Sequence, residues 1–512
     1  MSEKPPTNPW LVVLVASLAT FMEVLDTTIT NVSLRHIAGS LGAGQDESTW
    51  VITSYLVANG IILPLSGWLS DVFGRKKYFI FCILGFTLSS FFCGASTSLI
   101  TLIVFRVIQG AAGGGLQPAQ QAIVLDLFPP EKRGTVFAIT GITMVVAPIL
   151  GPTLGGIITD HVSWRWIFYI NIPVGLISAF LIWKMVEDPP HAKSQGFRKV
   201  DFTSLGFLSL GLAALQIVLD KGQQEDWFGS TFICTWAIIS FVCIAITLIW
   251  LTGQKDKIVD ISLFKDRAFA VSCALMFCVG FVLYGSTAIL PILLQSHFGY
   301  TATLAGLILS PSAIVVLLLM PFVGKIVNKI QARYLILFGL FLQAFGMFYS
   351  TNFNIDSDFG TFRVIRIFQM IGLPFLFIPI STLAFMNIPA IKRNKASAIF
   401  ALARNLGGSV GIAVVISYAA RSQQIHQNYL ASNLVPGRES YEALFARIQN
   451  LTENPEQING IIYRMLDEQA AMLAYIDAYK FLGIIMVFAI IISIFLLPGN
   501  KIEPKAEPVA VH

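Results

Sequence analysis

The sequence predicts an all-α membrane protein that crosses the bilayer many times, and three observations support this prediction. First, 55% of the 512 residues are hydrophobic and only 12% are charged, whereas an average soluble domain carries about 25% charged residues. Second, apolar stretches long enough to cross a hydrocarbon core of about 30 Å as a helix recur along the whole chain. Third, lysine and arginine gather in alternate connections between these stretches. These features exclude a water-soluble fold.

The apolar stretches predict fourteen membrane-spanning helices. The third and fourth are separated only by the turn "ASTSL". In chain order the expected ranges are approximately 10–34, 50–70, 78–97, 99–126, 135–159, 166–186, 203–220, 230–252, 268–296, 302–325, 333–352, 361–389, 396–419 and 473–497.

The orientation of these spans follows from the basic residues. The N-terminus, the connections after even-numbered spans and the C-terminus carry most of the 34 lysines and arginines. Cytoplasmic loops are enriched in these residues, so both termini are expected in the cytoplasm. On the outer side, the polar segment 420–472 contains two stretches with helical spacing of apolar positions. We expect it either to cap the outer mouth or to form a docking surface for a partner.

Residues of the first half recur in the second half at nearly the same offset. The pairs are Pro64 with Pro321, Gly67 with Gly324, Asp71 with Asn328, Arg106 with Arg366 and Gln109 with Gln369. A shared offset indicates two six-helix halves of the same orientation with two helices inserted between them. The expected division is 1–200 for the first half, 201–255 for the inserted helices, 256–500 for the second half with its outer loop, and 501–512 for a cytoplasmic tail.

Five short motifs follow one another on the expected spans: "LDTTITNVSL" (25–34), "GWLSDVFGRKK" (67–77), "RVIQG" (106–110), "APILGPTLGG" (147–156) and "WRWIFYINIPVG" (164–175). Together they resemble the major facilitator superfamily, specifically its fourteen-helix drug:proton antiporter branch and the EmrB-like members of that branch. The resemblance covers essentially the whole chain and departs at Ala147, where the motif usually has glycine. It implies the major facilitator fold and drug export driven by a proton gradient, with no cofactor.

Two carboxylates, Glu23 and Asp26, lie in the first apolar span, where a charge costs roughly 2.5–3.5 kcal/mol on insertion scales. Helical spacing places them on one face with Thr20 and Thr30. We expect these acids to face a cavity or a partner and to load and release protons; alternatively, they stay solvated near the outer interface. Arg106 is the natural counter-charge because a guanidinium keeps its proton, although it could instead only bind backbone carbonyls.

The loop at 67–77 combines glycines that permit a tight turn with an arginine that could pair with the acid ending span 4. By resemblance it is a latch that closes the cytoplasmic side, built from Gly67, Asp71, Gly74, Arg75, Lys76 and Asp126. The alternative is that its three basic residues only hold the loop inside.

Span 5 carries small or helix-bending residues on one side, which allows close approach of another helix. They are Pro148, Gly151, Pro152, Gly155 and Gly156. By resemblance, this side is the close-packed joint between the halves that favours antiport. The alternative is ordinary helix packing.

Aromatic and amide side chains along several spans could build an apolar, adaptable substrate pocket, although most such residues in a chain with 40 phenylalanines are core or lipid-facing. The candidates are Asn31, Gln109, Gln117, Phe277, Phe281, Tyr284, Gln369, Phe375 and Arg404. Arg404 either binds an anionic substrate or only packs.

Other functional classes lack their motifs. The sequence has no HExxH, GxSxG or phosphate-binding loop, and its six cysteines lack metal-ligand spacing, so we expect no catalytic residues, no metal and no ATP-driven pump. The predicted function is proton-coupled efflux of hydrophobic or amphipathic compounds by alternating access in the bacterial cytoplasmic (inner) membrane. The alternative is a dedicated metabolite or siderophore exporter. A periplasmic adaptor protein and an outer-membrane channel are possible partners, and nucleic acid is not, because the basic residues are spread among short loops.

Overall fold

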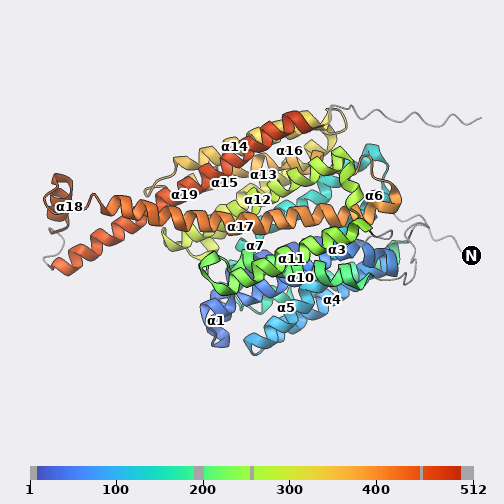
Figure 1. Ribbon diagram of the computed structural model, residues 1–512, viewed down its shortest axis with the longest axis horizontal. Helices are drawn as coiled ribbons and strands as arrows, with labels where there is room; N and C mark the ends of the chain where they lie inside the picture. Colours follow the sequence, from blue (N-terminus) through green and yellow to red (C-terminus); the bar gives the residue numbers. More distant parts are fainter. Residues whose placement is uncertain (1–7, 189–200, 254–258, 450–453, 498–512) are drawn as a thin grey trace, which may run out of the picture.

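The computed structural model describes residues 8–188, 201–253, 259–449 and 454–497, which fold into helices joined by short turns (Figure 1). Within this described part, fourteen helical segments are long and apolar enough to cross a membrane. The predicted number of spans is therefore confirmed. The helices run roughly along the long axis of the molecule (Figure 1). The expected tail 501–512 lies outside the described residues.

Six spans form the N-terminal half. α1 begins where the Asn8 side chain accepts a hydrogen bond from the Trp10 backbone N–H, and it ends at Gly42 in the left-handed region. The helices are α1 (Pro9–Leu41), α2 (Gln45–Ser48), α3 (Trp50–Phe73), α4 (Arg75–Ala95), α5 (Leu99–Gly113), α6 (Leu116–Leu127), η1 (Pro130–Lys132), α7 (Arg133–His161), α8 (Trp166–Tyr169) and α9 (Asn171–Met185).

The two inserted spans form a helical pair that packs against α3 (Figure 1). The pair consists of α10 (Phe202–Lys221), η3 (Trp227–Gly229) and α11 (Thr231–Gly253). The Thr53 hydroxyl of α3 donates a hydrogen bond to Asp220 of α10, and the Trp227 indole N–H donates to Ser417 Oγ at 3.0 Å. The inserted pair therefore contacts both halves of the molecule.

The remaining six spans form the C-terminal half. Its helices are η4 (Ile261–Lys265), α12 (Arg267–Ser296), α13 (Ala302–Ile326), α14 (Ala332–Tyr349), η5 (Ser350–Asn352), α15 (Phe359–Ile371), α16 (Leu373–Ala384), η6 (Ala390–Lys392), α17 (Arg393–Ala431), α18 (Glu439–Gln449) and α19 (Pro455–Leu496).

One span of each half is interrupted at an equivalent place. The fourth span breaks between α5 and α6 at Gly114 and Gly115, and the twelfth breaks between α15 and α16 at Gly372. A Cβ at Gly114 would lie 2.7 Å from the Asn59 carbonyl oxygen, and one at Gly372 would lie 2.7 Å from that of Gly339. Glycine is therefore needed because each break lies against the backbone of a neighbouring helix.

The segment 420–472 continues two transmembrane helices. α17 and α19 extend past the bundle without interruption, and α18 lies at their far tip (Figure 1). We call this projection the hairpin, its side of the bundle the hairpin end, and the opposite side, where α1 begins and α19 finishes, the terminal end. The expected cap over the bundle does not form, because no proline interrupts α17 or α19 after the first turn.

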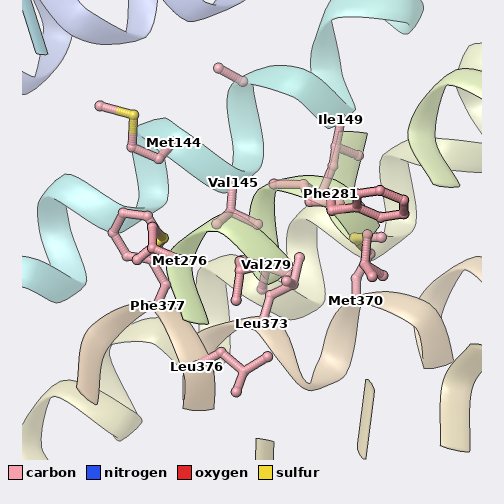
Figure 2. Close-up of a cluster of buried hydrophobic side chains, with 14 of the residues drawn as sticks. Met144, Val145, Ile149, Met276, Val279, Phe281, Met370, Leu373, Leu376 and Phe377 are labelled. Carbon is pink, nitrogen blue, oxygen red and sulfur yellow. The ribbon is translucent and has the colours of Figure 1, made fainter. Parts of the chain in front are cut away.

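Buried apolar side chains join the two halves. In Figure 2, Met144, Val145 and Ile149 of α7 lie against side chains of α12, α15 and α16 in the C-terminal half. Two glycine contacts also bring the backbones of α7 and α13 close together: Gly134 packs against Gly324, and Gly306 packs against Thr153. Hydrophobicity does not drive association between helices in lipid, so this close packing carries much of the cohesion between halves.

Candidate functional site: a buried charge network between the halves

Asp26 and Arg106 form an ion pair inside the N-terminal half. Arg106 Nη1 lies 2.5 Å from Asp26 Oδ2, and both side chains are fully buried. Asp26 Oδ1 also accepts hydrogen bonds from Gln109 Nε2 at 3.1 Å and Asn171 Nδ2 at 2.9 Å. The alternative that this acid stays solvated is therefore wrong in this structure.

Three further contacts, from α3 and α5, hold Arg106 in place. Its Nε donates to the Val51 carbonyl at 3.0 Å, and its Nη1 donates to Gln109 Oε1 at 2.8 Å. The ring of Tyr55 lies 4.1 Å from the guanidinium carbon, in cation–π geometry. Arg106 therefore has both of the roles considered from the sequence: it is the counter-charge of an acid, and it binds a backbone carbonyl.

Glu23 is 3% exposed and has neutral hydrogen-bond donors around it. Its carboxylate accepts from Gln117 Nε2 at 2.6 Å, from Asn59 Nδ2 at 3.1 Å and from the Tyr55 hydroxyl at 3.4 Å. Tyr55 contacts both Arg106 and Glu23, so the two acids belong to one network. Within the described part of the chain, Asp26 has a direct cationic partner and Glu23 has none.

Arg404 of α17 brings the C-terminal half into this network. It is buried, and its Nη2 donates to Oε1 of Gln117, the same amide that donates to Glu23. A small cavity between the halves opens beside this contact. It is lined by Gln117, Gln120, Gln121, Thr140, Met144, Phe377, Ala401 and Arg404. A charge change at Glu23 can therefore reach a cation of the opposite half through one side chain.

The structure does not gather the nine substrate candidates into one pocket. Gln117 and Arg404 line the cavity, while Gln109 belongs to the Asp26 site. Asn31 is exposed on α1, one turn beyond the network, because its position falls outside the buried face.

Five candidates lie on spans 9 and 12, and two of them also face the N-terminal half: Tyr284 lies near Glu23, and Phe281 lies beside Ile149 of α7 (Figure 2). Phe277 and Tyr284 pack against Gly407 and Gly408 of α17. Phe281 packs beside Phe481, Phe375 beside Phe338, and Gln369 binds Arg366. The role of these side chains in substrate binding stays a prediction. Helical spacing alone does not tell which neighbour a face meets.

The latch residues meet at the terminal end. Arg75, which is 2% exposed, donates to Asp126 and to the Ala122 carbonyl. Asp126 also accepts from Arg393 Nη1 of the C-terminal half at 2.6 Å. Asp71 accepts from Asn394 Nδ2, in the first turn of α17, at 2.6 Å. The latch therefore joins the two halves.

Two glycines of the latch are required by geometry. A Cβ at Gly67 would lie 3.0 Å from Lys395 Cα of α17, and Gly74 has a φ of 84° at the start of α4. Lys76 contributes its backbone N–H, which donates to Asp188 Oδ1 at 2.8 Å. Burial raises the pKa of the Asp188 carboxyl above its ordinary value.

A second latch repeats the first one with the roles of the two halves exchanged. Arg133, 260 residues before Arg393, donates to the Phe385 carbonyl at 3.1 Å, as Arg393 donates to the Leu125 carbonyl at 3.2 Å. Asn328, the counterpart of Asp71, donates to the Glu131 carbonyl at 2.6 Å. The duplicated motif therefore closes the terminal end from both halves.

The small residues of span 5 face two partners instead of one. α7 stays helical through Pro148 and Pro152. Gly151 and Gly155 pack against Thr28 and Ile29 of α1, whereas Gly156 packs against Thr303 of α13. Gly156 therefore lies at the predicted joint between the halves, whereas Gly151 and Gly155 show helix packing within the N-terminal half, because α7 lies between α1 and the opposite half.

Three polar residues of the network were not predicted from the sequence: Tyr55, Asn59 and Asn171. Tyr55 and Asn59 lie one turn apart on α3 and bind Glu23 together. Asn171 lies in the quoted motif 164–175 and binds both Asp26 and Ser90 Oγ. A polar side chain in an otherwise apolar span was the available signal for each of them.

A glycine contact sets the position of Arg106, and Gly110→Ala tests it. The added Cβ would meet the Tyr55 backbone, with Tyr55 Cα at 3.0 Å. We expect destabilisation by about 1–3 kcal/mol from overpacking and weaker transport, since α5 would move away from α3. Gly60→Ala is the matched control, because no atom of the described residues lies within 4 Å of its added Cβ. Equal thermal unfolding midpoints and transport rates for the two variants would contradict this reading.

The chain is similar over nearly its full length to known bacterial proteins. It is 36% identical to the multidrug export protein EmrB of Haemophilus influenzae, covering 93% of this chain and 94% of that protein. It is 37% identical to the fatty acid resistance protein FarB of Neisseria gonorrhoeae, covering 90% and 91%. Identity to EmrB of Escherichia coli K12 is 34%, covering 92% of each chain.

Solved structures share the fold at low sequence identity. A double tryptophan mutant of XylE matches with a TM-score of 0.63 at 14% identity, covering 97% of each chain. The human organic anion transporter MFSD10 matches with a TM-score of 0.61 at 13% identity, covering 96% of this chain and all of that one. The family model described as Major Facilitator Superfamily matches residues 16–412. The chain therefore belongs to the Major Facilitator Superfamily as an EmrB-like member, and it is a multi-pass membrane transporter and not an enzyme.

Proposed function

We propose that this transporter exports hydrophobic or amphipathic compounds across the bacterial cytoplasmic membrane in exchange for protons. The observation that carries the proposal is the chain of contacts from Asp26 and Arg106 through Tyr55 to Glu23, and from Glu23 through Gln117 to Arg404. Two buried carboxylates therefore lie near the boundary between the halves, which supports a role in binding protons. Buried acids in membrane spans are expensive, and they are typical of proton pathways.

Protonation changes what each acid can bind. The side-chain partners of both carboxylates are donors, which suits the ionised form because a neutral carboxyl must itself donate one hydrogen bond. A proton on Glu23 weakens its bond with Gln117 and releases that amide toward Arg404. A proton on Asp26 weakens its attraction to Arg106. Proton loading thus loosens the contacts around the central cavity.

The proposed cycle exposes this network alternately to the two sides of the membrane. The basic residues of the loops support a terminal end that lies on the cytoplasmic side, with both termini. The two latches then hold the cytoplasmic side closed, and their rupture opens it as the halves rock. The proton gradient supplies the energy, and the cycle uses no cofactor.

Substrate recognition in this proposal centres on the cavity beside Arg404. The relatives named above include multidrug export proteins and a fatty acid resistance protein, which fits a site that joins an apolar wall to a buried cation. Gln117, Gln120 and Thr140 offer hydrogen bonds, whereas Met144 and Phe377 supply apolar surface.

The hairpin is the proposed contact for a periplasmic adaptor protein and, through it, an outer-membrane channel. It extends as a helical arm beyond the bundle (Figure 1). The side chains of Ile425, Tyr429 and Tyr463 along this arm are at least 61% exposed. Exposed apolar side chains on such an arm are typical of a protein contact surface.

The test of this function uses inverted vesicles that hold an acid-inside gradient, with wild-type protein in one set and the Glu23→Gln, Asp26→Asn double variant in the other. Adding a fatty acid or a cationic dye should dissipate the gradient and drive uptake in wild type only. Glu47→Gln, an exposed acid on α2, should behave as wild type.

Two results would change the proposal. Gradient-driven uptake that survives both neutral substitutions would falsify proton coupling through these acids. Correctly folded wild type that moves protons with none of a broad panel of amphiphiles would instead favour a dedicated metabolite or siderophore exporter.

A further inference from the structure

Arg366 of α15 is a fully buried cation without an acidic partner. Among the described residues, no carboxylate forms an ion pair with it, and its side chain is 0% exposed. Its acceptors are neutral: Thr287 Oγ1 at 2.6 Å, Gln369 Oε1 at 2.9 Å and Ser286 Oγ at 3.3 Å. The transport mechanism proposed above does not use this group.

The duplicated halves show what is missing around Arg366. An offset of 260 residues relates the Asp26 site to this one, and it pairs Arg106 with Arg366, Gln109 with Gln369, Ser90 with Ser350 and Asp26 with Ser286. The arginine–glutamine bond is kept in both halves, at 2.8 and 2.9 Å. The carboxylate is not kept, because a serine hydroxyl stands where the first half has its anion.

An uncompensated charge at this position is costly. A guanidinium does not lose its proton in a protein, and a buried ion without a counter-ion suffers a desolvation penalty that neutral hydroxyls only partly offset. Among the described residues, two polar atoms here have no partner in hydrogen-bond geometry: Nε of Arg366 and the hydroxyl of Tyr479, which lies close to Gln369. Tyr479 of α19 is fully buried beside Arg366 and Gln369.

We propose that Arg366 and Tyr479, beside Ser286 at the position equivalent to Asp26, form a binding site for a small monovalent anion with the chemistry of chloride. One permanent positive charge matches one negative charge. The donors left to bind the anion are Arg366 Nε of α15 and the Tyr479 hydroxyl of α19, because the hydroxyls of Ser286 and Thr287 already donate to the Leu283 carbonyl. The side chains are all at most 8% exposed, which favours a monatomic anion over a carboxylate or phosphate. The anion would neutralise Arg366 in the C-terminal half as Asp26 neutralises Arg106 in the N-terminal half.

The experiment compares thermal unfolding of the purified full-length protein in sodium chloride and in sodium gluconate at equal ionic strength. Wild type should unfold about 2–4 °C higher in chloride, with a saturable dependence on its concentration, as for any ligand that binds only the folded state. Arg363→Gln is the matched control, since Arg363 is exposed on the same helix; it should keep the full chloride effect.

Ser286→Asp provides the decisive variant, because its carboxylate would occupy the place of the anion. We expect its unfolding midpoint in gluconate to equal or exceed that of wild type in gluconate, with no further gain from chloride. Arg366→Gln should also lose the chloride effect if it folds. The proposal is overturned if wild type unfolds equally in both salts, or if Ser286→Asp keeps the chloride effect or is simply destabilised by crowding.

Discussion

Asp26→Asn is expected to abolish proton-driven export while leaving substrate exchange intact. The amide cannot take up a proton, and it leaves Arg106 buried without its counter-ion, a loss that typically costs about 3–5 kcal/mol when a buried pair is broken. We expect gradient-driven transport to fall by at least about 100-fold, which corresponds to about 2.7 kcal/mol in the barrier. Substrate-for-substrate exchange across vesicles without a gradient moves no net protons and should persist.

Two further variants separate coupling from folding in this prediction. The Asp26→Asn, Arg106→Gln double variant removes both charges, so it should regain thermal stability without regaining coupling. Asp226→Asn is the control, because Asp226 is exposed and its left-handed backbone also suits asparagine. Loss of exchange in a stable Asp26→Asn protein would show that the acid binds substrate instead of coupling protons.

Asp126→Asn is expected to open the terminal end. This acid accepts from Arg75 of its own half and from Arg393 of the other half, and an amide oxygen can serve only one of them without placing its NH2 group against the second. We expect the closed state to lose about 3 kcal/mol relative to the open one, at the lower end for breaking a buried pair. Transport should fall because the closed state of the cycle is then poorly populated.

The measurement for this variant is the distance between spin labels at Glu131→Cys and Ile391→Cys, both exposed positions of η1 and η6, in a background without native cysteines. A longer-distance population should appear in Asp126→Asn. It should be absent in Asp356→Asn, which removes an exposed acid at the hairpin end. An unchanged distance distribution would mean that the helix packing of α7 and α13 holds this end closed without the latch.

Composition and periodicity were sufficient for the spans because each of them follows from local sequence. The number of spans and the repeat between halves depend on residues close together in the chain or at one constant offset. The breaks in the fourth and twelfth spans were not predicted. The hairpin was a second exception. Its polar sequence suggested a separate element, whereas α17 and α19 continue through it as uninterrupted helices.

The site was predictable as a set of residues but not as a set of contacts. Opposite charges in apolar spans identified Asp26 and Arg106, yet only the packing of α1 against α5 shows that they meet. Gln109 and Gln369 occupy matching motifs. Gln109 donates a hydrogen bond to the carboxylate of Asp26, whereas Gln369 accepts one from Arg366, which has no carboxylate partner among the described residues. The difference arises from position 286, which no local pattern around residue 369 reveals.

α17 has a mechanical consequence for whatever touches the far tip. Its 39 residues form one rod of about 58 Å, and Ala431 lies about 40 Å along it from Arg404. A tilt of roughly 10° pivoting at Arg404 would sweep the tip sideways by about 7 Å. The rod is thus a lever that converts a sub-nanometre rearrangement in mid-membrane into a displacement that a neighbouring molecule can feel.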